Sequence, residues 1–276
     1  MLISEKTQKF GLSGTALKYL ALVFMVFDHL HQFFLAYGVP IWFNMLGRLA
    51  LPIFLFMTAE GFYHTHNRRR YILQLLFGFL IMNFFDFALS VALPITHLKP
   101  EFTPELMNNI FGSLFFTALY IFFIRLFVEG IKEKRAGKIF GGFFLILLPI
   151  LVTALIYAVQ ITFPERVVFI ISSFIPNLLA VEGGFLFVIL GILFYFLRQW
   201  RWAQMLTLAA FSLLSFLAGV NTDYNIQWMM GVAILLLIFY NGKRGGHFAK
   251  FDKYFFYVFY PVHIYLLYVI AWLIQR

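Results

Sequence analysis

Long apolar runs separated by short polar stretches dominate this sequence. An α-helix needs about 20 consecutive, mainly apolar residues to cross the hydrocarbon core of a bilayer. Windows of that length predict nine membrane-spanning helices, at residues 16–37, 42–63, 71–93, 108–129, 138–160, 183–197, 202–220, 227–240 and 254–272. We therefore expect an all-α integral membrane protein, built as a bundle of these helices.

One further apolar segment, residues 167–180, is short for a span and is interrupted by Pro176. Counting it as a span would move the basic residues that follow it to the side opposite the other basic loops. We expect this segment to be re-entrant or interfacial, on the outer face, where protein or water surrounds its backbone.

Positive charge falls in alternate loops between the predicted spans. The basic clusters lie at residues 6–18, 68–70, 132–138, 198–201 and 243–253. Because cytoplasmic loops are enriched in Lys and Arg, this pattern predicts a cytoplasmic N-terminus and an external C-terminus. We expect a single polytopic transmembrane domain, in which residues 1–93 carry motif-bearing helices, residues 94–222 are less rich in motifs and residues 223–276 carry further motifs.

Composition supports the same class and narrows the chemistry. The 276 residues are 62% hydrophobic and 12% charged, with a mean hydropathy of +0.87, whereas soluble domains are about a quarter charged. The net charge of +9 fits membrane orientation and contact with anionic lipid rather than nucleic acid. The lack of Cys excludes disulfides, thiolate nucleophiles and Cys-ligated metals. The first apolar run lacks a small-x-small cleavage pattern, so we do not expect a cleavable signal peptide.

Ionisable residues fall inside the outer halves of the predicted spans, and we call them the outer group: Asp28, His29, Arg48 and Asp86. Intramembrane ionisable residues mark functional sites by default, so we interpret this group as catalytic. His29 is the candidate general base, with Asp28 or Asp86 as the acid that orients it. Arg48 either neutralises a carboxylate or holds a developing oxyanion. The alternative is an ion-pair network, Arg48 with Asp28 or Asp86, that only locks three helices together.

A second set of residues lies near the predicted cytoplasmic surface, and we call it the inner group: Glu60, His64, His66, Arg68, Arg69, Arg70 and His263. Its arginines suit the phosphates of a nucleotide-bearing donor, and Lys243 and Arg244 in an NGKRGG loop are further candidates. The alternative is that these charges only orient the protein. Glu60, His64 and His263 are candidate substrate-binding residues, and helix packing explains His263 equally well. We expect no metal site, because His64 and its neighbour two residues on do not share a helical face.

The motifs resemble those of the TraX family of bacterial membrane proteins. The resemblance rests on the combination, in this order, of DH, R-x-A-x-P-x-F with EGF-x-H-T, YNGKRG and FY-x-x-YPVH. It covers the amino-terminal third and the carboxy-terminal fifth of the chain, whereas residues 93–222 match only as hydrophobic spans. In this comparison His29 resembles the essential histidine of an early helix, and Arg48 resembles the arginine of the following helix.

The resemblance implies membership of a broad group of transmembrane acyltransferases. The namesake function of the family is acetylation of the pilin N-terminus, and relatives in the wider group move acyl groups from cytoplasmic acyl-CoA onto sugars outside. We therefore expect a multi-pass enzyme of the bacterial cytoplasmic membrane that uses acetyl-CoA. Its expected partners are an acceptor, either a protein N-terminus or a surface glycan, and membrane lipids, but no nucleic acid.

In the expected mechanism, acyl-CoA docks its phosphates at the basic mouth and extends its pantetheine arm towards His29, which deprotonates the acceptor. Direct transfer is favoured because the chain has no Cys and few Ser residues near the motifs, and an acyl-histidine intermediate is the alternative. The competing hypotheses are a transporter or flippase without chemistry and a non-catalytic assembly factor for surface structures.

Overall fold

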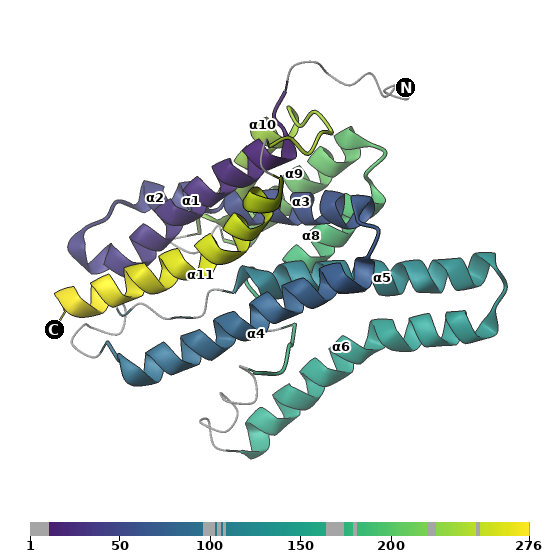
Figure 1. The fold of residues 1–276 in the computed structure, drawn as a ribbon, viewed down its shortest axis with the longest axis horizontal. Helices are drawn as coiled ribbons and strands as arrows, with labels where there is room; N and C mark the ends of the chain where they lie inside the picture. Colours follow the sequence, from purple (N-terminus) through teal and green to yellow (C-terminus); the bar gives the residue numbers. More distant parts are fainter. Residues whose placement is uncertain are drawn as a thin grey trace. The chain divides into compact units, whose positions relative to one another are not determined.

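A computed structural model describes residues 11–95, 103, 106, 109–163, 174–178, 181–219, 225–246 and 249–275, and the regular elements in these ranges are helices (Figure 1). Seven helical stretches of the described residues are long and apolar enough to cross a membrane: Gly14–Tyr37, Ile41–His64, Arg68–Ala92, Ile110–Lys132, Ala136–Val159, Arg201–Ala218 and Tyr254–Ile274. Two further apolar helices, Phe185–Phe196 and Gln227–Leu237, are shorter. The chain is therefore a multi-pass membrane protein.

The predicted spans correspond one to one to these helical stretches, but two of them are too short to cross a bilayer alone. The helix Phe185–Phe196 has 12 residues. The stretch Gln227–Leu237 joins a 7-residue 3-10 helix to a 4-residue α-helix. Helices of this size reach about 20 Å, against a hydrocarbon core of about 30 Å. Most of the predicted re-entrant segment, residues 167–173 and 179–180, lies outside the described residues. The side of the membrane on which each loop lies stays a prediction.

Contacts divide the chain into two compact units, and each is described by itself. The first unit comprises Met1–Met57, Leu93–Glu105 and Leu197–Arg276, and the second comprises Thr58–Ala92 and Leu106–Phe196. The boundary after Met57 falls within helix α3 (Ala50–His64). The predicted division at residues 93 and 222 rests on motifs rather than on contacts, and it stays a prediction.

In the first unit, α1 (Gly14–Phe34) packs against α2 (Ile41–Gly47) and α11 (Ala249–Ile274), and Figure 1 shows α1 and α11 side by side. The chain reverses between α1 and α2 at Gly38, whose φ of +81° suits glycine and whose N–H donates to the Leu35 carbonyl at 3.0 Å. Packing of α1 against its neighbours buries one of its faces, which includes Leu17, Ala21 and Met25.

The first unit also contains α9 (Arg201–Ala218), which packs against the 3-10 helix η3 (Gln227–Ala233) and the short α10 (Ile234–Leu237) that follows it. Ser212 of α9 donates a hydrogen bond to the Trp228 carbonyl of η3 at 2.5 Å. The pair of short helices is therefore fixed to a full-length helix, although it is too short to cross the membrane by itself.

The start of α1 is held by a loop from the far end of the chain, residues 239–246, which we call the capping loop. The first amides of a helix have no partner inside the helix. Here the Gly14 N–H donates to the Lys243 carbonyl at 2.9 Å, and the Thr15 N–H donates to the Arg244 carbonyl at 2.8 Å. The capping loop therefore satisfies two of these amides and fixes where α1 begins.

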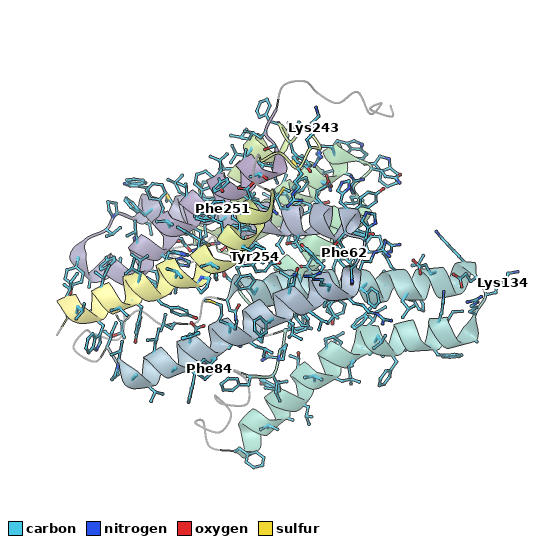
Figure 2. The ribbon with its side chains drawn as sticks, in the orientation of Figure 1. Phe62, Phe84, Lys134, Lys243, Phe251 and Tyr254 are labelled. Carbon is cyan, nitrogen blue, oxygen red and sulfur yellow. The ribbon has the colours of Figure 1, made fainter. Side chains whose placement is uncertain are left out.

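In the second unit, α5 (Ile110–Lys132) packs against three helices: α4 (Arg68–Ala92), α6 (Ala136–Thr162) and α8 (Phe185–Phe196). The first half of α5 is buried on every side, as expected of an apolar helix that others surround. Gly78 permits the contact between α4 and α5, because a Cβ there would lie 2.9 Å from the Phe111 ring. A tight turn that carries Lys134 joins α5 to α6 (Figure 2).

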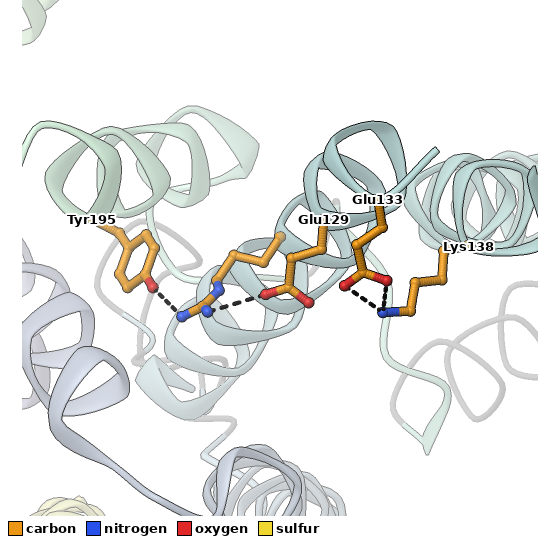
Figure 3. Close-up of polar contacts among 5 residues, drawn as sticks. Glu129, Glu133, Lys138 and Tyr195 are labelled. Atoms are coloured by element: carbon orange, nitrogen blue, oxygen red, sulfur yellow. Dashed lines mark hydrogen bonds and ion pairs between the residues drawn. The ribbon is translucent and has the colours of Figure 1, made fainter. Parts of the chain in front are cut away.

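Charged side chains tie α5 to its neighbours near this turn (Figure 3). Arg125 donates to the Tyr195 hydroxyl of α8 at 2.7 Å and to Glu129 at 3.2 Å. Lys138 of α6 donates to both carboxylate oxygens of Glu133, at 3.0 and 2.9 Å, and this hydrogen bonding holds the pKa of Glu133 below its usual range. Polar contacts therefore fix one end of α5, whereas apolar packing fixes the other.

Two glycines of the capping loop allow a matched test of the cap. Gly242 and Gly245 both have positive φ, at +76° and +69°, but a Cβ at Gly245 would also collide with the side chain of Ser13, which accepts the Ala16 N–H at 3.2 Å. We expect Gly245→Ala to lower the melting temperature of the detergent-purified protein more than Gly242→Ala, which introduces only the backbone strain of about 1 kcal/mol. Thermal unfolding of both variants tests this, and equal shifts would contradict it.

Candidate functional site

Two buried histidines meet inside the first unit. The Nδ1 atom of His29 on α1 lies 2.7 Å from the Nε2 atom of His263 on α11, and the two residues are 1% and 7% exposed. His29 continues a buried face of α1 with Met25 and Phe33, one turn before and one turn after it. This face packs against α11, so both imidazoles lie within helices of membrane-crossing length.

The prediction that His263 belongs to the inner group was wrong. His263 lies near the middle of α11 rather than at its end, and it faces His29 of the outer group. The physical reason is the packing of α11 against α1, which the local pattern of the sequence does not contain.

Aromatic rings enclose the histidine pair. The Phe259 ring stacks on His263 at a centroid distance of 5.0 Å and an interplanar angle of 16°. Tyr260 lies edge-on to His29 at 6.2 Å, and Phe33 lies 6.3 Å from the same imidazole. Rings on three sides limit the rotation of both imidazoles, so the short nitrogen–nitrogen contact is held by packing as well as by its own hydrogen bond.

Arg48, between α2 and α3, makes the second polar contact of the outer group. Its Nη2 atom lies 2.5 Å from Oδ1 of Asp28, and its Nη1 atom donates to the Gln227 side chain at 3.4 Å. Gly47 makes room for the ion pair, because a Cβ there would collide with the Asp28 side chain. Of the two predicted partners of Arg48, the structure therefore shows Asp28.

The Nδ1 nitrogen of His29, which a carboxylate was expected to orient, is instead held by a second imidazole. Asp28 and His29 are neighbours on α1, so their side chains point about 100° apart, and Asp28 reaches Arg48 while His29 reaches His263. Asp86 is a buried residue of α4 in the second unit. Its predicted approach to His29 stays a prediction.

The other residues of the inner group lie in the second unit. Glu60 and His64 are one turn apart on α3, with 3.8 Å between the His64 Nε2 and Glu60 Oε2 atoms. The Glu60 side chain is only 4% exposed, whereas that of His64 is 57% exposed. The Glu60 carboxylate is therefore buried, and the more exposed His64 imidazole lies next to it, as the i, i+4 spacing on a helix permits.

The three arginines of the inner group begin α4. The side chain of Asn67 accepts the Arg70 N–H at 2.9 Å and so caps this helix. Arg69 and Arg70 are exposed, whereas the Arg68 guanidinium lies 5.9 Å from the centre of the Phe62 ring. Two of the three arginines are therefore accessible to a ligand, and the third also packs against an aromatic ring.

Lys243 and Arg244 are exposed residues of the capping loop in the first unit, where Figure 2 labels Lys243. The glycines around them were expected to let the backbone approach a phosphate. In the structure, the carbonyls of both residues instead accept amides of α1. Their side chains stay candidates for anion binding, and a mouth shared with the arginines of α4 stays a prediction.

Sequence reasoning missed the contacts of two polar residues of the first unit, Gln227 and Arg201. Gln227 begins a predicted apolar run, and its contact with Arg48 explains why an amide is found there. The Arg201 guanidinium lies over the rings of Phe56 and Tyr240, at 4.7 and 5.0 Å. From the sequence alone, Arg201 is only part of a basic cluster that orients the protein. Nothing in the sequence around Arg201 indicates that its guanidinium meets aromatic rings. Among the described residues, no group of three or more His, Asp or Glu is placed to hold a metal ion.

Comparison with known proteins places this chain in a family. A family model described as "TraX protein" matches residues 13–271, which include both histidines, the Asp28–Arg48 pair and the capping loop. The chain belongs to the TraX family. This TraX-family chain is also 28% identical over 265 residues to "Probable fimbrial assembly protein FimC, serogroup H1" of Dichelobacter nodosus, covering 92% of this chain and 94% of that protein. No solved structure matches the chain at a significant level.

Removing one partner of the Asp28–Arg48 pair is expected to destabilise this TraX-family chain more than removing both charges. Arg48→Met leaves a largely buried carboxylate without its guanidinium, at an expected cost of about 3 kcal/mol. Adding Asp28→Asn removes that charge and recovers part of the loss. A double-mutant cycle of unfolding free energies measures the coupling.

The control for this cycle is Lys138→Met, which breaks the more exposed pair with Glu133 at the turn between α5 and α6. We expect no resolvable change there, because exposed ion pairs contribute little. A coupling energy near zero for Asp28 and Arg48 would contradict the prediction.

Proposed function

We propose that this TraX-family protein is a membrane acyltransferase that moves an acetyl group from acetyl-CoA to an amine or hydroxyl of an acceptor. The observation that carries the proposal is the buried histidine pair in helices of membrane-crossing length. Ionisable side chains are expensive inside a membrane and mark functional sites there. A neutral imidazole is the usual general base for removing a proton from a nucleophile near neutral pH.

The proposed reaction uses His29 as the base. The imidazole removes a proton from the acceptor while the acceptor nitrogen or oxygen attacks the thioester carbonyl of acetyl-CoA. The tetrahedral intermediate then expels the CoA sulfur, which takes the proton from His29, so that the products are the acetylated acceptor and CoA with a free thiol. The Asp28–Arg48 pair lies next to His29 along α1 and holds α2 and η3 in place around the base.

The proposed donor site is the basic mouth of Arg68, Arg69 and Arg70 in the second unit, with Glu60 and His64 as substrate-binding residues. Lys243 and Arg244 of the first unit are separate candidates for binding the donor's phosphates. Exposed guanidinium groups suit the several phosphate charges of CoA, because they form bidentate hydrogen bonds with phosphate oxygens. On the predicted topology, His29 lies about two-thirds of the way through a hydrocarbon core of about 30 Å, so a pantetheine arm that enters from the cytoplasmic face needs a reach of about 20 Å.

The name of the Dichelobacter relative, a probable fimbrial assembly protein, bears on the acceptor. It favours a subunit of a surface fibre, with its N-terminal amine as the nucleophile, over a surface glycan. The same name also favours a second candidate function, that of a non-catalytic assembly factor. An assembly factor has no need for the imidazole of His29, whereas the acyltransferase does, so the two functions differ in their response to the loss of that side chain.

The first test is acetyl-CoA turnover by the purified protein, measured as slow hydrolysis without an acceptor and as transfer to a fibre-subunit peptide. We expect His29→Ala to lower the rate by roughly 100-fold or more, because general-base catalysis contributes about that factor. The melting temperature should fall, because the change removes a buried hydrogen bond, so the rate is compared at a temperature at which both proteins are folded. The affinity for acetyl-CoA should stay close to that of the wild type. Folded wild-type protein that neither binds nor turns over acetyl-CoA would overturn the proposal and leave the assembly factor.

The donor mouth is tested by Arg69→Gln, because this side chain is exposed whereas Arg68 also packs against Phe62. We expect roughly fivefold weaker binding of acetyl-CoA, the effect of losing about 1 kcal/mol at an exposed phosphate contact. Lys132→Gln removes the same charge from an exposed position at the end of α5 and is the matched control. Equal effects of the two variants on the dissociation constant would mean that only overall charge attracts the donor.

A further inference from the structure

Two successive hydrogen bonds connect the backbone of α11 to the proposed base. The Nδ1 atom of His263 lies 2.9 Å from the carbonyl oxygen of Phe259, one turn earlier in the same helix. The other ring nitrogen of His263, Nε2, lies 2.7 Å from Nδ1 of His29. Both separations are within hydrogen-bond range, so each of the two contacts needs one proton.

The carbonyl at the start of this row decides where the protons are. A carbonyl oxygen only accepts, so the Nδ1 atom of His263 must carry a hydrogen. A neutral imidazole has one N–H, which makes Nε2 of His263 an acceptor. The hydrogen between the two rings therefore belongs to Nδ1 of His29, and the Nε2 atom of His29 is left with a free lone pair.

The alternative distribution requires a positive charge in an apolar place. Only a doubly protonated His263 would donate from Nε2, and His29 would then accept at Nδ1 and carry its own proton on Nε2. Both residues are more than nine-tenths buried among aromatic rings, and the contacts described for the two imidazoles include no carboxylate. An imidazolium is strongly disfavoured in such a place. The neutral pair is therefore the arrangement that the packing supports.

We infer that His263 is a positioning residue, which fixes His29 in the tautomer with a bare Nε2 and so makes Nε2 the atom that takes the proton of the acceptor. This inference rests on the proposed function for the identity of the reaction, but the tautomer itself rests on the two hydrogen bonds alone. The role is different from substrate binding, because His263 acts on the reaction through His29.

The same geometry assists the base after it has taken the proton. His29 then has two N–H groups, and the one on Nδ1 still points to the Nε2 lone pair of His263. A hydrogen bond from a cation to a neutral acceptor is stronger than one between neutral groups, so the pair stabilises the imidazolium as it forms. A carboxylate would stabilise it more, but a permanent anion is expensive inside a membrane, whereas a second imidazole adds no charge to the resting state.

The tautomers are measured first, without any substrate. Protein labelled with ¹⁵N at histidine and purified in detergent gives imidazole nitrogen signals that separate protonated from unprotonated atoms. We expect a protonated Nδ1 and a bare Nε2 for both His29 and His263, assigned by loss of signals in single His→Gln variants. His31 is an internal reference, because its Nδ1 lies 3.0 Å from the Val39 carbonyl and must be protonated for the same reason. A wild-type His29 that carries its proton on Nε2 would overturn the inference.

Measurements of kcat and KM show whether His263 positions His29 or only packs against it. His263→Leu removes the acceptor, and we expect kcat for acetyl transfer to fall roughly 100-fold with little change in KM for acetyl-CoA, because the base loses its fixed tautomer. His263→Gln keeps an acceptor oxygen near the former Nε2 position and should recover at least tenfold of that loss. Equal kcat values for the Leu and Gln variants, with both folded, would mean that His263 only packs.

These outcomes are distinguishable from failure of the proposed function. If the wild type neither binds nor turns over acetyl-CoA, the acyltransferase proposal fails, and the nitrogen signals of His29 still decide its tautomer. If the wild type is active but His29 has the other tautomer, the acyltransferase proposal is supported and the positioning role of His263 is contradicted. Lys132→Gln, at an exposed position at the end of α5, is the control for adding a glutamine to the chain and should leave kcat unchanged.

Discussion

Polar groups inside apolar helices need polar partners, because hydrocarbon offers no hydrogen bonds and an unsatisfied group costs several kcal/mol. In the first unit α1 meets this demand with partners from other segments of the chain. Its first amides bind the carbonyls of the capping loop, Asp28 binds Arg48 and His29 binds His263. The requirement that brings these helices together therefore also assembles the candidate site, and stability and chemistry depend on the same few contacts.

The positions of the helices could be predicted from the sequence because hydrophobic length is a local property. Their ends were harder to predict where apolar residues continue beyond the helix. Residues 183 and 184 were placed within a span, but both are glycines with positive φ, at +75° and +74°, and the helix begins only at Phe185. A hydropathy window averages over such a turn, so it does not show where the helix begins or ends. The lengths of the two short helices were overestimated for this reason.

The candidate site was predictable only as far as single helices allow. The cost of charge in a membrane singled out Asp28, His29 and Arg48, and the ion pair between Asp28 and Arg48 was one of two expected. The partner of His29 was not expected, because it lies 234 positions away and nothing near His263 indicates which helix it meets. The tautomer inferred for His29 could not be predicted from the sequence either, because it depends on a carbonyl oxygen within 3 Å of the Nδ1 atom of His263.

The number of residues that separate α1 from its partners along the chain also sets the order in which their contacts can form during synthesis. Gly245 of the capping loop, whose carbonyl accepts the Thr15 hydroxyl, and His263 follow their partners on α1 by 230 and 234 residues. At about 5–20 residues per second a ribosome needs roughly 10–50 s to make that length of chain. Throughout this interval α1 is in or near the membrane without the groups that bind its amides and its imidazole. Because α11 completes the pair, a nascent or truncated chain that lacks this helix carries no assembled base.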